Sequence, residues 1–156
     1  MRRKDREITD YGKMLEIVKA CDCCQIGLLD ENGAYIVPLN FGYDAKEKDL
    51  ILYFHGAGEG KKIDLIRTQD TVSFEMDTKH MLVEKDSSCG YSFLFQSIMG
   101  RGRIEILQDK AEKVHGLELV MEHYSDKTDW EFPEQMVRRT AVLKLTVTEW
   151  SCKEHA

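Results

Sequence analysis

The stretch L-I-L-Y-F-H-G-A-G-E-G-K-K, residues 50–62, joins an apolar strand to a glycine-rich loop and to two lysines that open the next predicted helix. Glycines let backbone N–H groups approach an anion, a helix N-terminus adds positive potential, and lysines neutralise negative charge. The stretch therefore predicts a site for a phosphorylated small molecule. An ordinary solvated loop is the alternative, because short glycine patterns recur freely.

The glycine loop does not match the common nucleotide-binding motifs. A Walker A loop has four residues between its glycines and Ser or Thr after its Lys, whereas Gly56 and Gly60 enclose three residues and Lys62 follows Lys61. The dinucleotide pattern G-x-G-x-x-G is not matched either. A nucleotide triphosphate held in the usual way is therefore not expected.

Composition limits the classes of protein that this chain can represent. Its 156 residues suit a single domain, residues 1–156, that can bury a core without metals or disulfides. The net charge of −6 argues against a nucleic-acid binder and against binding to an anionic membrane. The charged start has no apolar run after it, so neither a signal peptide nor an anchor is expected, and the protein is predicted to be cytoplasmic.

Periodicity predicts a mostly antiparallel sheet with helices outside it. Asp10 is a candidate helix cap, Asp109 with Glu112 forms a capping box, and Asn32-Gly33 is a strong hairpin turn. Many short strands with glycine turns are typical of a mainly β fold, a small closed or partly open barrel with peripheral α-helices. The predicted strands are residues 24–28, 35–42, 50–55, 71–76, 97–107 and 141–150, and the predicted helices begin after residue 10, span 61–67 and end at 124.

Several single residues refine this prediction. Pro38 cannot donate to a ladder, so its strand is expected at an edge or a bulge, where free backbone groups can face a ligand. Gly100 and Gly102 fall on the inner face of their strand, which implies tight curvature or the close approach of something large. The helix that ends at residue 124 is expected to bury Leu117, Val120, Met121 and Tyr124.

The motifs of this chain resemble those of the pyridoxamine-phosphate-oxidase-like FMN-binding split barrels, and within them the nitroimidazole-resistance (Nim-type) flavoproteins. Two departures exist: Gly56 stands where many members have Ser, which removes one phosphate hydroxyl contact, and residues 151–154 read S-C-K-E where many have T-G-K-E. The resemblance spans nearly the whole length, and its motifs are M-R-R (1–3), V-P-L-N-F-G (37–42), Y-F-H-G-A-G-E-G-K-K (53–62), S-I-M-G-R-G-R (97–103) and H-Y-S (123–125).

The resemblance implies an antiparallel split β-barrel with non-covalent FMN at a homodimer interface. One small barrel offers only a shallow groove for a flat tricyclic ring, so the second subunit is part of the expectation. The phosphate is expected near the lysine loop and the isoalloxazine ring against the P-L-N segment. The implied cofactor-binding residues are Val37, Pro38, Leu39, Asn40, Tyr53, Phe54, His55, Gly56, Ala57, Lys61, Lys62, Gln96 and Ser97.

Three functions remain open at this level. The first is an FMN-dependent oxidoreductase that takes hydride from NAD(P)H and reduces a small nitroaromatic (5-nitroimidazole) or quinone-type acceptor. The second is an oxidase of the pyridoxamine 5'-phosphate oxidase kind, although no residues are evident for a second phosphate. The third is a non-enzymatic flavin- or haem-binding protein, with His55, His80 or His123 as possible iron ligands. Residues 78–91, expected to form a loop, give no readable code for the acceptor.

Other conspicuous side chains have simpler alternatives. His55, the candidate catalytic residue, could be a hydrogen-bonded structural histidine. The pair Cys21-x-x-Cys24 has zinc or redox spacing, but no second ligand pair follows, so no metal site is predicted and a reducing compartment is favoured. Trp150 could cover a flavin or simply pack, and Arg138-Arg139 could reach a phosphate or cap a helix.

Overall fold

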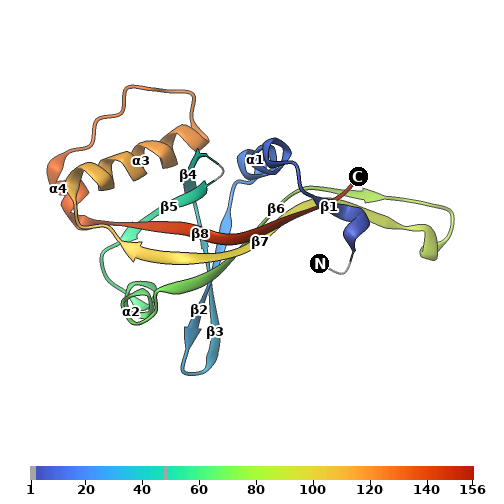
Figure 1. Ribbon diagram of the computed structural model, residues 1–156, viewed down its shortest axis with the longest axis horizontal. Coiled ribbons are helices and arrows are strands. Elements are labelled where there is room, and N and C mark those ends of the chain that lie inside the picture. Colours follow the sequence, from blue (N-terminus) through green and yellow to red (C-terminus); the bar gives the residue numbers. More distant parts are fainter. Residues whose placement is uncertain (1–2, 48) are drawn as a thin grey trace.

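The computed structural model describes residues 3–47 and 49–156, so Met1 and Arg2 of the first family motif lie outside the described residues. Its frame is an eight-stranded sheet with the order β3-β2-β6-β7-β8-β5-β4, in which β1 pairs with β8 (Figure 1). Every ladder in it is antiparallel. The strands are β1 Glu7–Ile8, β2 Cys24–Asp30, β3 Gly33–Leu39, β4 Phe41–Lys46, β5 Asp49–Ala57, β6 Thr71–Val83, β7 Ser92–Ile106 and β8 Thr140–His155.

The sheet is curled, because its two outermost strands are joined directly. β3 and β4 lie at opposite ends of the strand order, yet only Asn40 separates them in the chain. Strands joined by one residue must lie close together at that end, so the sheet closes there into a partly open barrel. The barrel encloses the main core, whose largest fully buried side chains include Phe41, Phe54, Ile26, Leu52, Met76, Ile98, Leu143 and Leu145. The predicted fold class, a mainly β split barrel, is confirmed.

The helices cover the outside of the barrel as expected. They are α1 Tyr11–Ala20, α2 Lys61–Thr68, α3 Lys110–Tyr124 and α4 Glu134–Arg139, with short 3₁₀ turns at Lys4–Arg6 and Ser88–Gly90. Both predicted caps are confirmed: Asp10 accepts from the Lys13 amide at 2.8 Å and Asp109 from the Glu112 amide at 2.9 Å. Among the described residues, no helix has the length and apolar character that a membrane crossing would need.

The two glycines of β7 are required by close approach. A Cβ on Gly100 would lie 2.6 Å from the Phe74 ring, and one on Gly102 would lie 2.2 Å from the backbone carbonyl of Thr146 on β8. The register of β7 against β8 shifts between Arg101 and Gly102. The expectation of close approach is therefore confirmed, and the approaching groups are an aromatic ring and the neighbouring strand.

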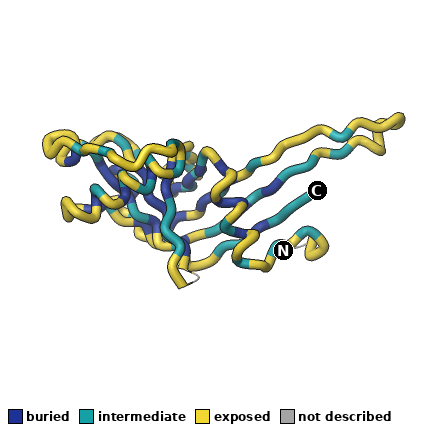
Figure 2. The backbone as a smooth tube through the Cα atoms, turned by 90° about the horizontal axis from the view of Figure 1, so that it is seen from above, coloured by how far each residue is buried: buried dark blue, intermediate teal, exposed yellow. Residues whose placement is uncertain are grey.

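Two strand boundaries predicted from the sequence are wrong. Residues 35–42 do not form one strand, because the chain turns at Asn40 from β3 into β4. Residues 78–83 are not part of a loop, since β6 continues to Val83, and only residues 84–91 connect it to β7, which begins at Ser92. The two strands form a projecting hairpin, residues 79–94, which we call the arm (Figure 2). Much of the arm is exposed, so no buried face imposes the alternation that marks a strand.

The predicted apolar face of α3 is only partly right. Tyr124 is 42% exposed, whereas Lys113, Gly116 and Val120 are buried. A Cβ on Gly116 would come within 2.8 Å of the Tyr53 ring, so the helix lies against β5 at its glycine. This contact turns the helix away from the orientation that large apolar side chains alone would favour. A second, smaller core of Tyr53, Leu107, Val120 and Val142 lies beneath α3.

Candidate functional site

The end of β5 presents a short exposed segment beside β8. His55, Gly56 and Ala57 pair with Val142, Ala141 and Thr140. Strand alternation buries the Phe54 side chain in the main core and that of Tyr53 in the second core. Neither side chain is available to a ligand at the surface, so the side chain of His55 and the backbone of Gly56 and Ala57 are the surface groups here.

Gly60 shapes the entry into α2. Its φ of 116° lies in the left-handed region that side chains rarely adopt, and its carbonyl accepts from the amides of Ile63 and Asp64 at 2.9 and 3.1 Å. The first amides of a helix have no partner within the helix and point outward with the positive end of its dipole. Lys61 and Lys62 lie in this first turn, so the turn combines backbone donors with two ammonium groups.

The two adjacent lysines have different surroundings. The Lys61 ammonium forms an ion pair with Asp30 and lies 4.6 Å from the centre of the Tyr35 ring. Lys62 has no carboxylate within ion-pair distance among the described residues, and partial burial lowers the pKa of its ammonium. The Lys62 Nζ lies 2.7 Å from the point where a Cβ on Gly56 would be. Its ammonium thus occupies the space in which a side chain at position 56 would begin.

His55 belongs electrostatically to the same group. Partial desolvation and, secondarily, the positive charge of Lys62 lower the pKa of the His55 imidazole from its ordinary value. The neutral imidazole is therefore favoured near neutral pH. An anion placed between His55 and Lys62 would oppose this effect, because a negative charge stabilises the imidazolium.

The P-L-N segment occupies the free edge of the sheet. In β3, Val37 and Leu39 pack against the core, whereas Pro38 and the following Asn40 are exposed. β3 pairs with β2 and is the last strand of the order, which confirms the edge position predicted from Pro38. Tyr35, near the beginning of β3, contacts Lys61. The other end of β3 is the Asn40 corner, which lies four to five residues, or about 15 Å, further along the strand.

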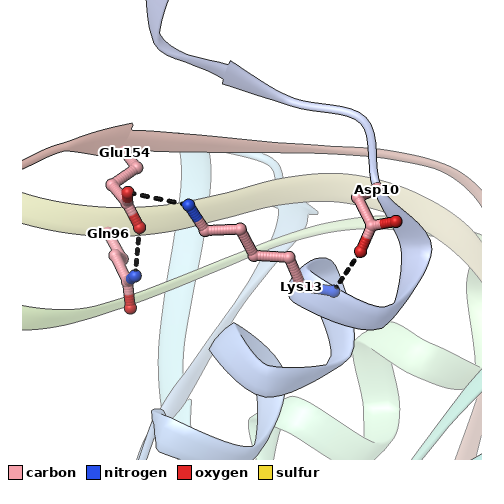
Figure 3. Close-up of polar contacts among 4 residues, drawn as sticks. All are labelled: Asp10, Lys13, Gln96 and Glu154. Carbon is pink, nitrogen blue, oxygen red and sulfur yellow. Dashed lines mark hydrogen bonds and ion pairs between the residues drawn. The ribbon is translucent and has the colours of Figure 1, made fainter.

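Gln96 and Ser97 lie in the middle of β7 and face opposite sides of the sheet. Gln96 is buried, and its Nε2 donates to Glu154, whose other carboxylate oxygen accepts from Lys13 Nζ at 3.0 Å (Figure 3). The hydrogen bonds from Gln96 and Lys13 lower the pKa of Glu154. Since a carboxylate can only accept, this contact fixes the amide, and Gln96 Oε1 is left buried with no hydrogen-bond partner among the described residues.

The structure brings only part of the predicted site together within the chain. His55, Gly56, Ala57 and Lys62 form one group, and the N-terminal end of β3 meets it through Tyr35 and Lys61. Ser97 is remote from Pro38, because β2, β6 and β7 follow β3 in the sheet and three strand spacings amount to about 14 Å. The Gln96 side chain faces away from Ser97 altogether.

Three residues important to these groups were missed or misread from the sequence. Asp30 neutralises Lys61, Glu154 orients Gln96, and the Tyr124 hydroxyl accepts from the Phe41 amide at 3.1 Å. Asp30 precedes the predicted hairpin turn and Lys61 begins a predicted helix. No local pattern in the sequence indicates that the two residues are in contact. The sequence signal for Glu154 was its place after Lys153 in the S-C-K-E motif.

The cysteine cluster is part of the core. Cys21, Cys24 and Cys152 are buried free thiols, and burial raises the pKa of Cys21 and of Cys152 to about 12. A thiol with so high a pKa is almost fully protonated at neutral pH and is a poor nucleophile. These cysteines therefore pack as small apolar side chains.

The family model described as pyridoxamine 5'-phosphate oxidase matches residues 10–154. The chain belongs to this family. The match runs from the start of α1 to the last residue but one of β8 and contains the lysine loop, so it includes every candidate site residue. None of the curated proteins matches the chain.

Solved structures resemble the chain over almost its full length. One is a candidate 5-nitroimidazole antibiotic resistance protein from Bacteroides thetaiotaomicron, 32% identical over 95% of this chain and 86% of that one, with a TM-score of 0.82. The flavocytochrome Anf3 from Azotobacter vinelandii is 22% identical over 100% and 72% of the two chains, with a TM-score of 0.82. An FAD- and haem-binding protein from Mycobacterium smegmatis is 18% identical over 96% and 73%, with a TM-score of 0.81. The last two show the shared fold alone.

Proposed function

We propose that this protein of the pyridoxamine 5'-phosphate oxidase family binds FMN and is an NAD(P)H-linked reductase of small nitroaromatic or quinone-type acceptors. The observation that carries the proposal is Lys62, a partly desolvated ammonium with no carboxylate partner among the described residues, placed over Gly56 at the start of a helix. Such an uncompensated cation favours a bound anion, and a phosphate dianion fits the amides of the helix turn beside it.

The residues that would hold FMN extend from its phosphate end to its ring end. Lys62, His55 and the backbone of Gly56 and Ala57 would hold the phosphate, with Lys61 as a weaker partner because Asp30 already neutralises it. The exposed edge of β3, from Val37 to Asn40, would then take the ring through its backbone and the Asn40 amide. Tyr53 and Phe54 would contribute only support from the two cores, since their side chains are buried.

A homodimer is the second part of the proposal. Ser97 lies about 14 Å from Pro38 across the sheet, so the same ring would meet both segments only if Ser97 came from the second copy. The arm also exposes Met81, Leu82, Tyr91 and Phe93 at about half of their surface or more. A two-stranded ribbon with so much exposed apolar surface is poorly stable alone, and a second subunit would cover it.

The chemistry is that of the bound flavin, which would accept a hydride from NAD(P)H and pass electrons to the acceptor. The protein would orient the ring and exclude water. Reduction of a nitro group also consumes protons. A bound phosphate would raise the pKa of His55, which Lys62 and partial desolvation lower in its absence, and the imidazolium so favoured would donate one of these protons. The similarity to the candidate 5-nitroimidazole antibiotic resistance protein supports this acceptor class.

Flavin reduction tests the proposal directly. The purified protein, loaded with FMN, should lose its flavin absorbance on addition of NADH or NADPH and regain it when a nitroimidazole or a quinone is added. A Soret band in place of a flavin spectrum would indicate a haem protein instead. Turnover with pyridoxamine 5'-phosphate and oxygen, without turnover of NAD(P)H, would assign the oxidase activity and overturn the reductase.

The variant His55→Gln separates a proton donor from a cofactor contact. Glutamine keeps the size and can still donate a hydrogen bond to the phosphate but cannot cycle a proton, so we expect FMN binding close to that of the parent and an acceptor half-reaction about 100-fold slower. His115→Gln is the matched control, because His115 lies at the surface of α3 against Tyr53. Loss of FMN in His55→Gln would limit the residue to holding the cofactor, and unchanged half-reactions with parent-like FMN binding would make it structural.

A further inference from the structure

The corner between β3 and β4 connects the two outermost strands of the sheet. It consists of Asn40 alone, yet it joins the two ends of the strand order and so closes the barrel. In the proposed flavin site, which this inference presupposes, Asn40 also carries the amide that meets the ring. A single residue thus has to be held accurately although it is exposed and lies outside both ladders.

The hydroxyl of Tyr124 holds this corner from outside the sheet. It accepts from the Phe41 amide at 3.1 Å and donates to the Asp22 carbonyl at 2.7 Å. One O–H group therefore joins the β3–β4 corner to the segment between α1 and β2, and its donor and an acceptor site are both used. Without the hydroxyl, the Phe41 amide would lose this partner.

The end of α3 is firmly placed, which makes it a suitable anchor. His123 Nε2 lies 2.7 Å from the Cys21 carbonyl, and its ring lies 4.4 Å from the Phe41 ring. A Cβ on Gly42 would lie 2.3 Å from the α3 backbone at Leu119 and Val120, so helix and strand are in direct backbone contact. The position of the Tyr124 hydroxyl is consequently set by α3 and not by a flexible chain end.

We infer that Tyr124 is a positioning residue of the flavin site: its hydroxyl sets the Asn40 corner, and the corner presents the amide to the ring. The residue touches neither the lysine loop nor the groups assigned to the phosphate. Its removal should therefore weaken binding at the ring end only, by the same factor for FMN and for riboflavin, whereas removal of Lys62 should weaken FMN alone.

The test compares the binding of FMN and of riboflavin to Tyr124→Phe, to a control variant, to Asn40→Ala and to the double variant. In Tyr124→Phe, which lacks only the hydroxyl, we expect FMN and riboflavin to bind about tenfold more weakly, as measured by quenching of flavin fluorescence. Tyr11→Phe on α1 is the matched control, because it also removes a hydroxyl that bonds to the backbone, at the Asp49 carbonyl at 3.3 Å, and it should bind both flavins like the parent. The visible circular dichroism of saturated FMN should change in Tyr124→Phe and remain unchanged in Tyr11→Phe, because it reports the surroundings of the ring.

A double-mutant cycle distinguishes positioning from general stability. If Tyr124 acts through Asn40, the double variant Asn40→Ala, Tyr124→Phe should bind flavin no more weakly than Asn40→Ala alone. Additive losses, or a loss for FMN without one for riboflavin, would overturn the inference, as would parent-like binding by Tyr124→Phe. A parent protein that binds neither flavin would instead overturn the proposed function itself, together with any role of Tyr124 in it.

Discussion

The two ends of β3 are held by different kinds of interaction. At the hairpin end, Lys61 pairs with Asp30 and lies over Tyr35, and the Gln69 amide exchanges two hydrogen bonds with the backbone of Leu29, at 2.9 and 3.0 Å. At the corner end, Phe41 is fully buried, Gly42 lies against the α3 backbone, and Tyr124 bonds to the Phe41 amide. One end is a set of exposed side-chain contacts and the other is a packed junction.

The difference separates binding from folding. Exposed ion pairs contribute little to stability, so the charged side chains near the hairpin end can be replaced without unfolding the protein. A close backbone contact has no such freedom, because any added atom forces whole elements apart. We therefore expect substitutions near the lysine loop to change flavin binding in a folded protein, and substitutions that add atoms at the packed backbone contact of the corner to change the fold first.

The largest effect is expected for Gly42→Ala. Its Cβ would lie 2.3 Å from the backbone of Leu119 and Val120, and neither of these atoms can rotate away. The helix α3 must shift, so the free energy of unfolding should fall by about 3 kcal/mol or more. Urea denaturation of the FMN-free protein measures it.

Gly27→Ala is the matched control, since it also lies within a strand. The nearest atom to its Cβ would be the Ser73 carbonyl oxygen at 3.8 Å, an ordinary contact, so we expect a change of about 0.5 kcal/mol or less. Equal stability of the two variants would mean that α3 yields easily and that the corner is not the rigid end of β3.

The sequence allowed the barrel to be predicted, because its signals are local. Asp10 and Asp109 mark helix starts, Pro38 marks an edge strand, and Gly100 and Gly102 mark close approach, all of which the structure has. The arm was missed because both of its faces are largely open to solvent and its residues need not alternate. The two hydrogen bonds of the Tyr124 hydroxyl were missed because its partners are backbone groups, which no residue type in the sequence indicates.

The candidate site was predictable as a set of residues but not as an arrangement. Lys61 and Lys62 read alike in the sequence, and only the fold, which places Asp30 beside one of them, makes them different. Gln96 and Ser97 are neighbours in the chain, yet strand alternation turns them to opposite faces. Tertiary contacts between distant residues decide both outcomes.

The next effect in size sharpens the contrast within the lysine loop. Lys62→Ala should weaken FMN by about 2 kcal/mol, because it removes a charge-assisted hydrogen bond from a partly desolvated group. Lys61→Ala removes the same charge but one already paired with Asp30, so we expect a loss of about 0.5 kcal/mol or less. Riboflavin, which lacks the phosphate, should bind both variants like the parent, and fluorescence titration measures all four affinities. Equal losses for the two lysines would remove the distinction drawn from Asp30.

The smallest effect concerns the ion pair between Lys13 and Glu154, which belongs to neither end of β3. It is a reference for how much one ion pair contributes to the stability of the fold. Glu154 accepts from Gln96 and from Lys13, and its pKa is lowered from the ordinary value of 4.5. A carboxyl whose pKa is lower in the folded protein stabilises the fold above pH 4.5, and this stabilisation is lost as the pH falls through the folded value.

Lys13→Met should therefore lower the free energy of unfolding by about 0.5 to 1 kcal/mol at pH 7, where Glu154 is ionised, a small effect because the Lys13 side chain is 44% exposed. At pH 3 the difference between variant and parent should shrink toward zero, since the carboxyl is then increasingly protonated in both. Lys19→Met, on the same helix but without a carboxylate in ion-pair distance among the described residues, is the control and should show no such pH dependence. Urea denaturation at the two pH values decides it: a difference that stays constant between pH 7 and pH 3 would mean that Lys13 stabilises the protein by packing its aliphatic chain and not through Glu154.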